Sequence, residues 1–356
     1  MAKVLSGSSS FQYKGKQVNY SEIAEELQVT HIVEGSVRKA GDNLRITARL
    51  INALDAQTLW AERYDRSGNE LFVLQDKLIR NIVNSMSLKL TNREKKLLEH
   101  PTTSDFKAYD LYLKGRQFMT QRTANANRQA QTYYQQAINT DPSFARAHGA
   151  LAVAKIMAAN NYWGDDPEVE KRQALDYAIK ATQLTKDSQH VYWALGFTHL
   201  YLKQHDKAKA AVEQSLKIAP NYADAYALLA LINNNMGLAK ESISLIPKAM
   251  YLNPLYSWDY LFNLGWAHYT LGEYEKSEEL LLKALERNPN SRLTRLILIA
   301  NYIASNMEDE AEWQVDELLL QYPELNMQSI QNNMPLIANQ TSVRFLANLK
   351  KAGIPD

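Results

Sequence analysis

The stretch Leu261–Pro289, LFNLGWAHYTLGEYEKSEELLLKALERNP, decides how this chain folds. It contains two runs in which apolar residues recur every three or four positions, which is the spacing of amphipathic helices. Gly272 lies between the runs, where a residue that tolerates positive φ allows a tight turn. Gly265 and Ala284 are small residues on the facing sides of the two runs, and Asn288-Pro289 follows the second run. The stretch therefore predicts two antiparallel helices packed closely together.

The same features recur along the chain at a fixed interval. Pro220, Pro254, Pro289 and Pro323 are separated by 34, 35 and 34 residues, and Pro142 fits the same slot upstream. Small side chains let neighbouring helices approach closely. Three positions in each interval, which we call the small slots, hold small residues almost throughout. The first slot holds Gly115, Ala152, Gly196, Ala230, Gly265 and Ile299. The second holds Ala130, Ala174, Ala208, Ser242, Ser277 and Ala311, and the third holds Ala137, Ala181, Ser215, Ala249, Ala284 and Leu318. The pattern predicts six helix pairs over residues 98–323.

A period of about 34 residues with small residues at these slots is typical of the tetratricopeptide repeat. The chain resembles this family strongly over residues 188–323 and well over residues 105–187. Ile299 and Leu318 depart from the pattern, so we expect the last pair to pack more loosely or at another angle. The resemblance implies an all-α solenoid that binds a protein or peptide partner. Residues 324–356 are expected to form capping helices.

The second helix pair carries about ten extra residues around 160–167. Asp165 and Asp166 suggest a calcium loop, but the alternating ligand spacing of such loops is missing. Asp166-Pro167 fits the start of a helix, with an aspartate cap followed by proline at the first helical position. The sequence favours the cap.

The resemblance also indicates where a partner would bind, because the first helix of each stacked pair lines the concave face. An Asn side chain can donate and accept hydrogen bonds with an extended peptide, and aromatic residues are common anchors in peptide grooves. The candidate groove residues are Tyr109, Tyr112, Arg116, His190, Trp193, Tyr201, Asp224, Asn234, Asn235, Asp259, Phe262, Trp266 and Tyr269. An alternative stays open, that half of the aromatics simply pack between neighbouring helix pairs. Tyr201 and Tyr269 fit it less well, because their hydroxyls need water or a partner.

The first 97 residues lack the repeat pattern. Their sequence predicts a small α/β domain with an antiparallel or mixed sheet. We expect a short helix over residues 21–27 that begins at a Ser21 cap. Three strand patterns follow at residues 31–39, 44–52 and 58–64, with apolar and polar residues alternating in the second. A long amphipathic helix is expected over about 70–90, and residues 91–104 are a polar link.

Four segments of this domain carry a second resemblance. Residues 32–38 (IVEGSVR), 44–51 (LRITARLI), 59–66 (LWAERYDR) and 74–76 (LQD) are similar to the TolB-like domain that precedes tetratricopeptide repeats in bacterial signalling proteins. Residues 349–355 (LKKAGIP) resemble the usual ending of those proteins. Many of them are associated with adenylate or guanylate cyclases or with CadC-like transcriptional regulators. The resemblance implies a regulatory role. It also implies a periplasmic location if a membrane helix precedes this region, and a cytoplasmic one otherwise.

Members of that family usually open with an apolar strand and a helix ahead of the segment that matches residues 4–16. Neither is present here, so we expect a partial domain with a bare strand edge near Val4-Leu5 or Ile32–Val37. Bare edges recruit further strands. The expectation is a homodimer formed through this domain.

Composition and motifs argue against catalysis by this chain. The charges balance at 40 basic and 39 acidic residues, which disfavours nucleic acid or a membrane surface as partner. No run of 18 apolar residues is present and cysteine is absent, which excludes disulfides and thiolate chemistry. There is no phosphate loop and no nucleophile elbow. We expect no cofactor, no metal and no enzyme activity, so that any cyclase activity would belong to a separate domain.

One charged cluster needs an explanation. Arg38, Arg45 and Arg49, with Glu34 and Glu62, could be read as an acid/base site. Charged pairs across the exposed face of an antiparallel sheet are far more ordinary. The sequence favours the second interpretation.

Overall fold

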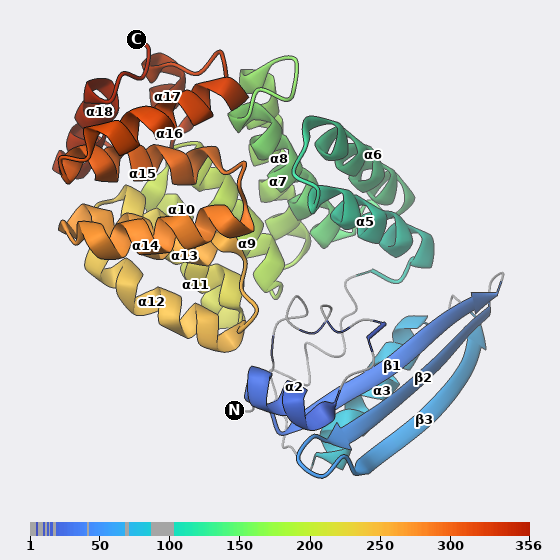
Figure 1. Cartoon of the computed structure of the whole chain (residues 1–356). Helices are drawn as coiled ribbons and strands as arrows, with labels where there is room; N and C mark the ends of the chain where they lie inside the picture. Colours follow the sequence, from blue (N-terminus) through green and yellow to red (C-terminus); the bar gives the residue numbers. More distant parts are fainter. Residues whose placement is uncertain are drawn as a thin grey trace. The chain divides into compact units, whose positions relative to one another are not determined.

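A computed structural model describes residues 19–40, 43–67, 71–86 and 103–356, together with positions 5, 10, 13, 15 and 16. A small antiparallel sheet is followed by a solenoid of helix pairs (Figure 1). The chain divides into two compact units. The sheet unit comprises residues 10–122 and 128–147, and the solenoid unit comprises residues 1–9, 123–127 and 148–356. The expected domain boundary at residue 97 and the polar link before residue 103 fall outside the described residues.

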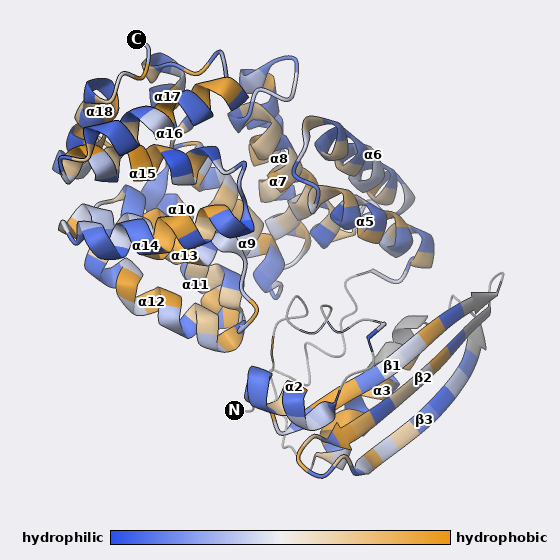
Figure 2. Cartoon of the chain, in the orientation of Figure 1, coloured by the Kyte–Doolittle hydropathy of each residue, from blue (hydrophilic) through white to orange (hydrophobic). Residues whose placement is uncertain are grey.

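The sheet has three strands in the order β1 (His31–Ala40), β2 (Asn43–Asn52) and β3 (Thr58–Ser67). Both neighbouring pairs are antiparallel, with Val37 opposite Ile46 and Ile46 opposite Tyr64. Polar exposed and apolar buried residues alternate along β2 from Arg45 to Leu50. Figure 2 colours the three strands by hydropathy. The three strand patterns are therefore confirmed, and the sheet is antiparallel.

Two helices accompany the sheet. Helix α3 (Leu71–Ser85) packs Leu74 and Leu78 against Ile46 and Tyr64, which gives this domain a small core. Helix α2 (Tyr20–Leu27) contacts β1. The Asn19 side chain accepts a hydrogen bond from the Ser21 backbone amide, so Asn19 caps this helix. The expected Ser21 cap was wrong because an asparagine two residues earlier makes the same bond.

The helices that follow the sheet along the chain form pairs with short connections. They are α5 (Phe106–Met119) with α6 (Ala124–Thr140), α7 (Ala145–Asn160) with α8 (Pro167–Leu184), α9 (Gln189–Tyr201) with α10 (His205–Ile218), α11 (Ala223–Asn235) with α12 (Ala239–Leu252), α13 (Trp258–Leu271) with α14 (Tyr274–Arg287), and α15 (Arg292–Ala304) with α16 (Glu308–Gln321). Two further helices follow, α17 (Met327–Asn333) and α18 (Gln340–Lys351).

Every residue in the three small slots is buried. A Cβ atom on Gly196 would lie 2.5 Å from Val212 Cγ2, and one on Gly265 would lie 2.8 Å from Leu281 Cγ. These separations are shorter than van der Waals contact, so the α9–α10 and α13–α14 pairs need glycine at these two positions. The slots are therefore the contact points of the helices, as their spacing predicts.

Local signals end and begin helices as expected. Gly272 has φ 78° and caps the C-terminus of α13, and Gly237 has φ 77° between α11 and α12. The Asp166 carboxylate accepts hydrogen bonds from the backbone amides of Glu168 and Val169, with Pro167 at the first helical position. The Asp165-Asp166 segment is thus a helix start. Among the described residues, no helix is both long and apolar enough to cross a membrane.

The last 30 residues pack against the preceding helix pairs. Asn326 and Asn339 form capping boxes at the starts of α17 and α18. Phe345, Leu349 and Ile354 enter the same hydrophobic cluster as residues of α13, α15 and α16. We refer to residues 327–356 as the C-terminal segment.

Candidate functional site

The candidate groove residues lie in both units, and each group is described by itself. Tyr109, Tyr112 and Arg116 belong to α5 in the sheet unit, and all the others belong to the solenoid unit. Tyr112 is buried between Phe144 and Tyr134, with ring centroids at 5.2 and 5.8 Å. Tyr112 is therefore a core residue. Tyr109 is half-buried and Arg116 is exposed.

The candidate amides of α11 and the candidate aromatics of α13 are buried. Asn234, Asn235, Phe262, Trp266 and Tyr269 each expose 3% of their surface or less. Asn234 Nδ2 donates to the backbone carbonyl of Asn263 at 2.8 Å, and Asn235 Nδ2 donates to that of Leu231 at 2.8 Å. The amides therefore bond to neighbouring backbone in place of an extended peptide.

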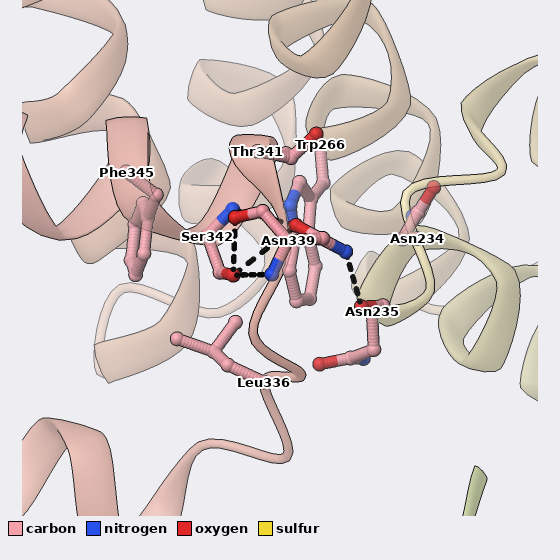
Figure 3. A pocket seen from close by; sticks show the side chains of 8 residues that line it. All are labelled: Asn234, Asn235, Trp266, Leu336, Asn339, Thr341, Ser342 and Phe345. Atoms are coloured by element: carbon pink, nitrogen blue, oxygen red, sulfur yellow. Dashed lines mark hydrogen bonds between the residues drawn. The ribbon is translucent and has the colours of Figure 1, made fainter.

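The C-terminal segment covers part of this region. Trp266, Asn234 and Asn235 line a small cavity of about 10 Å³ together with Asn339, Ser342 and Phe345 from the segment (Figure 3). This is roughly the space of one water molecule. Asn339 Nδ2 approaches the Asn235 carbonyl at 3.5 Å. The cavity is too small for a peptide side chain.

The segment follows the C-terminal ends of successive first helices. Lys203, just after α9, donates to the Gln331 carbonyl at 2.7 Å. Asn348 Nδ2 donates to the Tyr269 hydroxyl and to the Ala300 carbonyl, each at 3.1 Å. The partner that we expected for the Tyr269 hydroxyl is thus supplied by the chain itself.

A row of aromatic side chains on α9 remains partly exposed. The Trp193 and Phe197 rings stack with centroids 5.2 Å apart, and the Phe197 and Tyr201 centroids are 4.9 Å apart. His190 meets the Tyr222 ring edge-on at 5.0 Å. All four α9 residues are half-buried. We call His190, Trp193, Phe197 and Tyr201 the aromatic row.

One of the two acidic candidates, Asp224, lies beside the row. Trp193 Nε1 donates to the backbone carbonyl of Asp224 at 3.1 Å, which fixes the indole against the start of α11. The Asp224 carboxylate is exposed and accepts from the buried Tyr260 hydroxyl at 3.0 Å. Desolvation of that phenol, followed by the charge of Asp224, raises the pKa of Tyr260. Asp259 is half-buried at the start of α13. Asp224 is thus an acidic group beside the row.

A half-buried arginine, Arg292, was not among the expected site residues. Arg292, at the start of α15, donates to the Asn160 carbonyl at 3.3 Å and lies 5.7 Å from the centre of the Tyr322 ring. Burial lowers the pKa of Arg292, while Tyr322, Tyr201 and Tyr162 act in the opposite direction. No carboxylate of the described residues forms an ion pair with it. The arginine is visible in the sequence, but its surroundings come from segments up to 132 residues away.

The charged residues of the sheet do not form one site. Glu34 and Arg49 pair at 2.7 Å across β1 and β2, and Arg45 and Asp65 pair at 2.6 Å across β2 and β3. Glu62 points to the other face and contacts Asn81 of α3. Within the part of the chain that the structure describes, no three His, Asp or Glu side chains are grouped to hold a metal ion. The cross-strand interpretation therefore accounts for Glu34, Arg45 and Arg49, whereas Arg38 lies opposite Arg45 and forms no ion pair among the described residues.

Comparison with known proteins identifies the repeats. Residues 189–222 and residues 258–291 each match the tetratricopeptide repeat family. The chain therefore contains tetratricopeptide repeats.

One relative has a curated description. Over 208 residues the chain is 33% identical to "Putative adenylate cyclase 3" of Rhizobium meliloti (strain 1021). The match covers 58% of this chain and 35% of that protein, so the chain spans about a third of its relative.

Solved structures with a similar fold include PilF of Pseudomonas aeruginosa, with TM-score 0.44 and 18% identity over 63% of this chain and 95% of that one. The APC/C assembly of Cut9 and Hcn1 gives TM-score 0.49 and 17% identity over 76% of this chain and 54% of that one.

Proposed function

We propose that this chain is a non-enzymatic interaction and signalling module that binds a protein or peptide partner along the aromatic row of α9. The observation that carries the proposal is the contrast in exposure between first helices. Phe262, Trp266 and Tyr269 of α13 are buried. Trp193, Phe197 and Tyr201 of α9, by contrast, stay half-exposed in one continuous row of ring contacts. Exposed aromatic anchors that need no rearrangement are suited to hold apolar side chains of a partner.

Arg292 supports a more specific partner. Arg292 is half-buried and forms no ion pair with a carboxylate among the described residues. Tyr201, the last residue of the aromatic row, is one of the phenols near enough to affect the pKa of Arg292. A buried cation gains most from an anionic group that can reach it. The proposed partner is therefore a peptide with apolar side chains next to a carboxylate.

A peptide array tests this proposal. Random peptides are screened for binding to the whole chain, and the retained sequences are measured by fluorescence anisotropy. We expect Trp193→Ala to weaken the binding of retained peptides at least tenfold, because one anchor is lost. Trp313→Ala is the matched control, because Trp313 is 59% exposed on α16, outside the row. Equal retention of peptides by Trp193→Ala and wild type would rule out the row.

A second proposal is that the chain is the regulatory part of a larger, membrane-associated adenylate or guanylate cyclase, or of a CadC-like transcriptional regulator. The 33% identity to a protein named as an adenylate cyclase supports the first of these. We expect the chain alone to form no cyclic nucleotide from ATP or GTP with Mg²⁺ or Mn²⁺. Product formation that scales with the concentration of the chain would contradict a non-enzymatic role.

We further propose that the N-terminal domain, resembling TolB, mediates self-association. Strand β1 pairs only with β2 among the described strands, which supports its outer edge as the site of association. Light scattering over a range of concentrations measures this association directly.

A further inference from the structure

Strand β1 leaves apolar side chains of the sheet uncovered. Val33 and Val37 are 53% and 65% exposed, although their cross-strand neighbours Leu50 and Ile46 are buried. The difference arises because α3 contacts β2 and β3, so its apolar side covers those strands. A half-covered apolar face beside an unpaired edge is the arrangement that further strand addition completes.

The opposite face of β1 carries a charge that no described residue pairs with. Arg38 lies directly opposite Arg45, and Asp65 binds Arg45 at 2.6 Å and Arg63 at 3.0 Å. Within the described ranges Arg38 has no ion-pair partner of its own. Like charges directly opposite each other destabilise a strand pair. Arg38 would therefore gain from an acidic residue on its other side.

Glu34 is the acidic residue on the same face and strand. Its Oε2 atom receives all three of its hydrogen bonds, from Arg49 Nε at 2.9 Å, Arg49 Nη2 at 2.7 Å and the Tyr20 hydroxyl at 2.6 Å. The Oε1 atom accepts none of these bonds, so it is available to a donor beyond the edge.

We infer that a second copy of this chain adds its own β1 antiparallel to the first, with the two-fold axis at Ser36. The inference rests on the proposed self-association and specifies its register. With Ser36 opposite Ser36, Glu34 of each copy lies opposite Arg38 of the other. Two opposite-charge pairs then replace two unsatisfied arginines, and a six-stranded sheet results.

The same register suits the apolar face. Val37 lies opposite Gly35 of the second copy, where there is no side chain to obstruct it. Val33 and Val37 from both copies then form one apolar stripe between the two α3 helices. A shift of the centre to Gly35 would place Glu34 opposite Ser36 and Arg38 opposite Ile32, which leaves both charges unpaired. Charge pairing therefore favours a two-fold axis at Ser36 over one at Gly35.

Disulfide trapping tests the register, and the chain has no cysteine of its own. Residues directly opposite in antiparallel strands have Cα atoms about 4.5–5.5 Å apart, within the range of a disulfide. We expect Ser36→Cys to form a covalent dimer on mild oxidation. Thr47→Cys is the control, since it is exposed on the same face of β2. Its two copies would be three strand spacings apart, about 14 Å, so it should not cross-link.

A charge variant provides an independent arm. Arg38→Glu faces Arg45 within its own chain, so the fold is kept, but it faces Glu34 in the second copy. We expect the dissociation constant of the dimer to rise about tenfold at low salt. If wild type dimerises while Ser36→Cys fails to cross-link, the register is overturned and self-association stands. If wild type stays monomeric at all concentrations, both are overturned, whereas peptide binding by the aromatic row is untouched.

Discussion

The guanidinium of Arg344 lies over the ring of Tyr269, 5.2 Å from its centre, 75 residues away along the chain. Its Nη2 atom donates to the backbone carbonyls of Tyr269 at 3.2 Å and Thr270 at 2.9 Å. These carbonyls belong to the last turn of α13, where few backbone amides remain as donors. The Tyr269 carbonyl also accepts a hydrogen bond from the Gly272 backbone amide at 3.1 Å. Arg344 of α18 therefore caps the C-terminus of α13. Its positive charge also interacts favourably with the negative end of the helix dipole.

The first prediction concerns this cap. Arg344→Ala should lower the free energy of unfolding by about 1.5–3 kcal/mol, because charged hydrogen bonds to two buried carbonyls are lost. Arg344→Lys should recover only part of the loss, since an ammonium keeps the charge without the planar fork. Urea denaturation measures both variants. A lysine variant as stable as wild type would show that charge alone matters.

The second prediction concerns the anchor of the C-terminal segment. Phe345 is 1% exposed in the cluster shared by α13, α15 and α16. Phe345→Ala should cost about 3–5 kcal/mol, because the lost apolar contacts leave a cavity. Val343→Ala on the same helix, where the side chain is 65% exposed, should change stability by less than about 0.5 kcal/mol. Equal effects would mean that the segment is not part of the core.

The repeats could be predicted from the sequence because their determinants are local. A small residue such as Ala208 or Ser242 sits at a helix crossing wherever the period places it, and both are fully buried. The Asp166-Pro167 start was readable for the same reason. Each of these signals acts within a few residues.

The burial of the groove residues could not be predicted in this way. The capping box at Asn339 indicates the start of a helix. No neighbouring residue, however, specifies that the Asn339 side chain reaches Asn235, 104 residues earlier. The asparagines of α11 suggested a bound peptide because a side-chain amide inside a helix needs a hydrogen-bond partner. The partner of Asn234 is the carbonyl of Asn263 in the next first helix. A non-local pairing of this kind leaves no periodic trace.

The third prediction is a stability change at alkaline pH. Burial raises the pKa of Tyr269 to about 12, with Arg344 and Asn348 opposing. The pKa of tyrosine in the unfolded chain is about 10, so the folded state holds the phenol proton more tightly. The resulting stabilisation is fully present below pH 10 and is lost as the pH rises toward 12. For this group the loss approaches about 2–3 kcal/mol. Other buried tyrosines also contribute, so the comparison needs a matched variant.

Tyr269→Phe is that variant, because it removes the ionising group and keeps the ring. At neutral pH it should cost about 1 kcal/mol through the lost bond with Asn348. Between pH 10 and 12 its unfolding free energy should fall less steeply than that of wild type. Parallel curves for the two proteins, measured by urea titration at each pH, would contradict the assignment.

The last prediction concerns Gly196 at the crossing of α9 and α10. Alanine normally stabilises a helix by about 1 kcal/mol relative to glycine. Here its Cβ would lie 2.5 Å from Val212 Cγ2 and 3.1 Å from the Ala208 carbonyl oxygen. Overpacking of this kind costs about 1–3 kcal/mol, and the valine side chain is too stiff to turn away. Gly196→Ala should therefore be destabilising despite the better helix propensity.

A double-mutant cycle separates the clash from other effects. Val212→Ala removes the methyl group that alanine at position 196 would strike, while leaving the backbone contact with Ala208. In that background Gly196→Ala should cost at least about 1 kcal/mol less than in wild type, since coupled neighbours are not additive. Additive losses would show that the small slot is required by the backbone approach and not by Val212. Because α9 carries the aromatic row, the same variants should also weaken peptide binding in proportion to the displacement of α9.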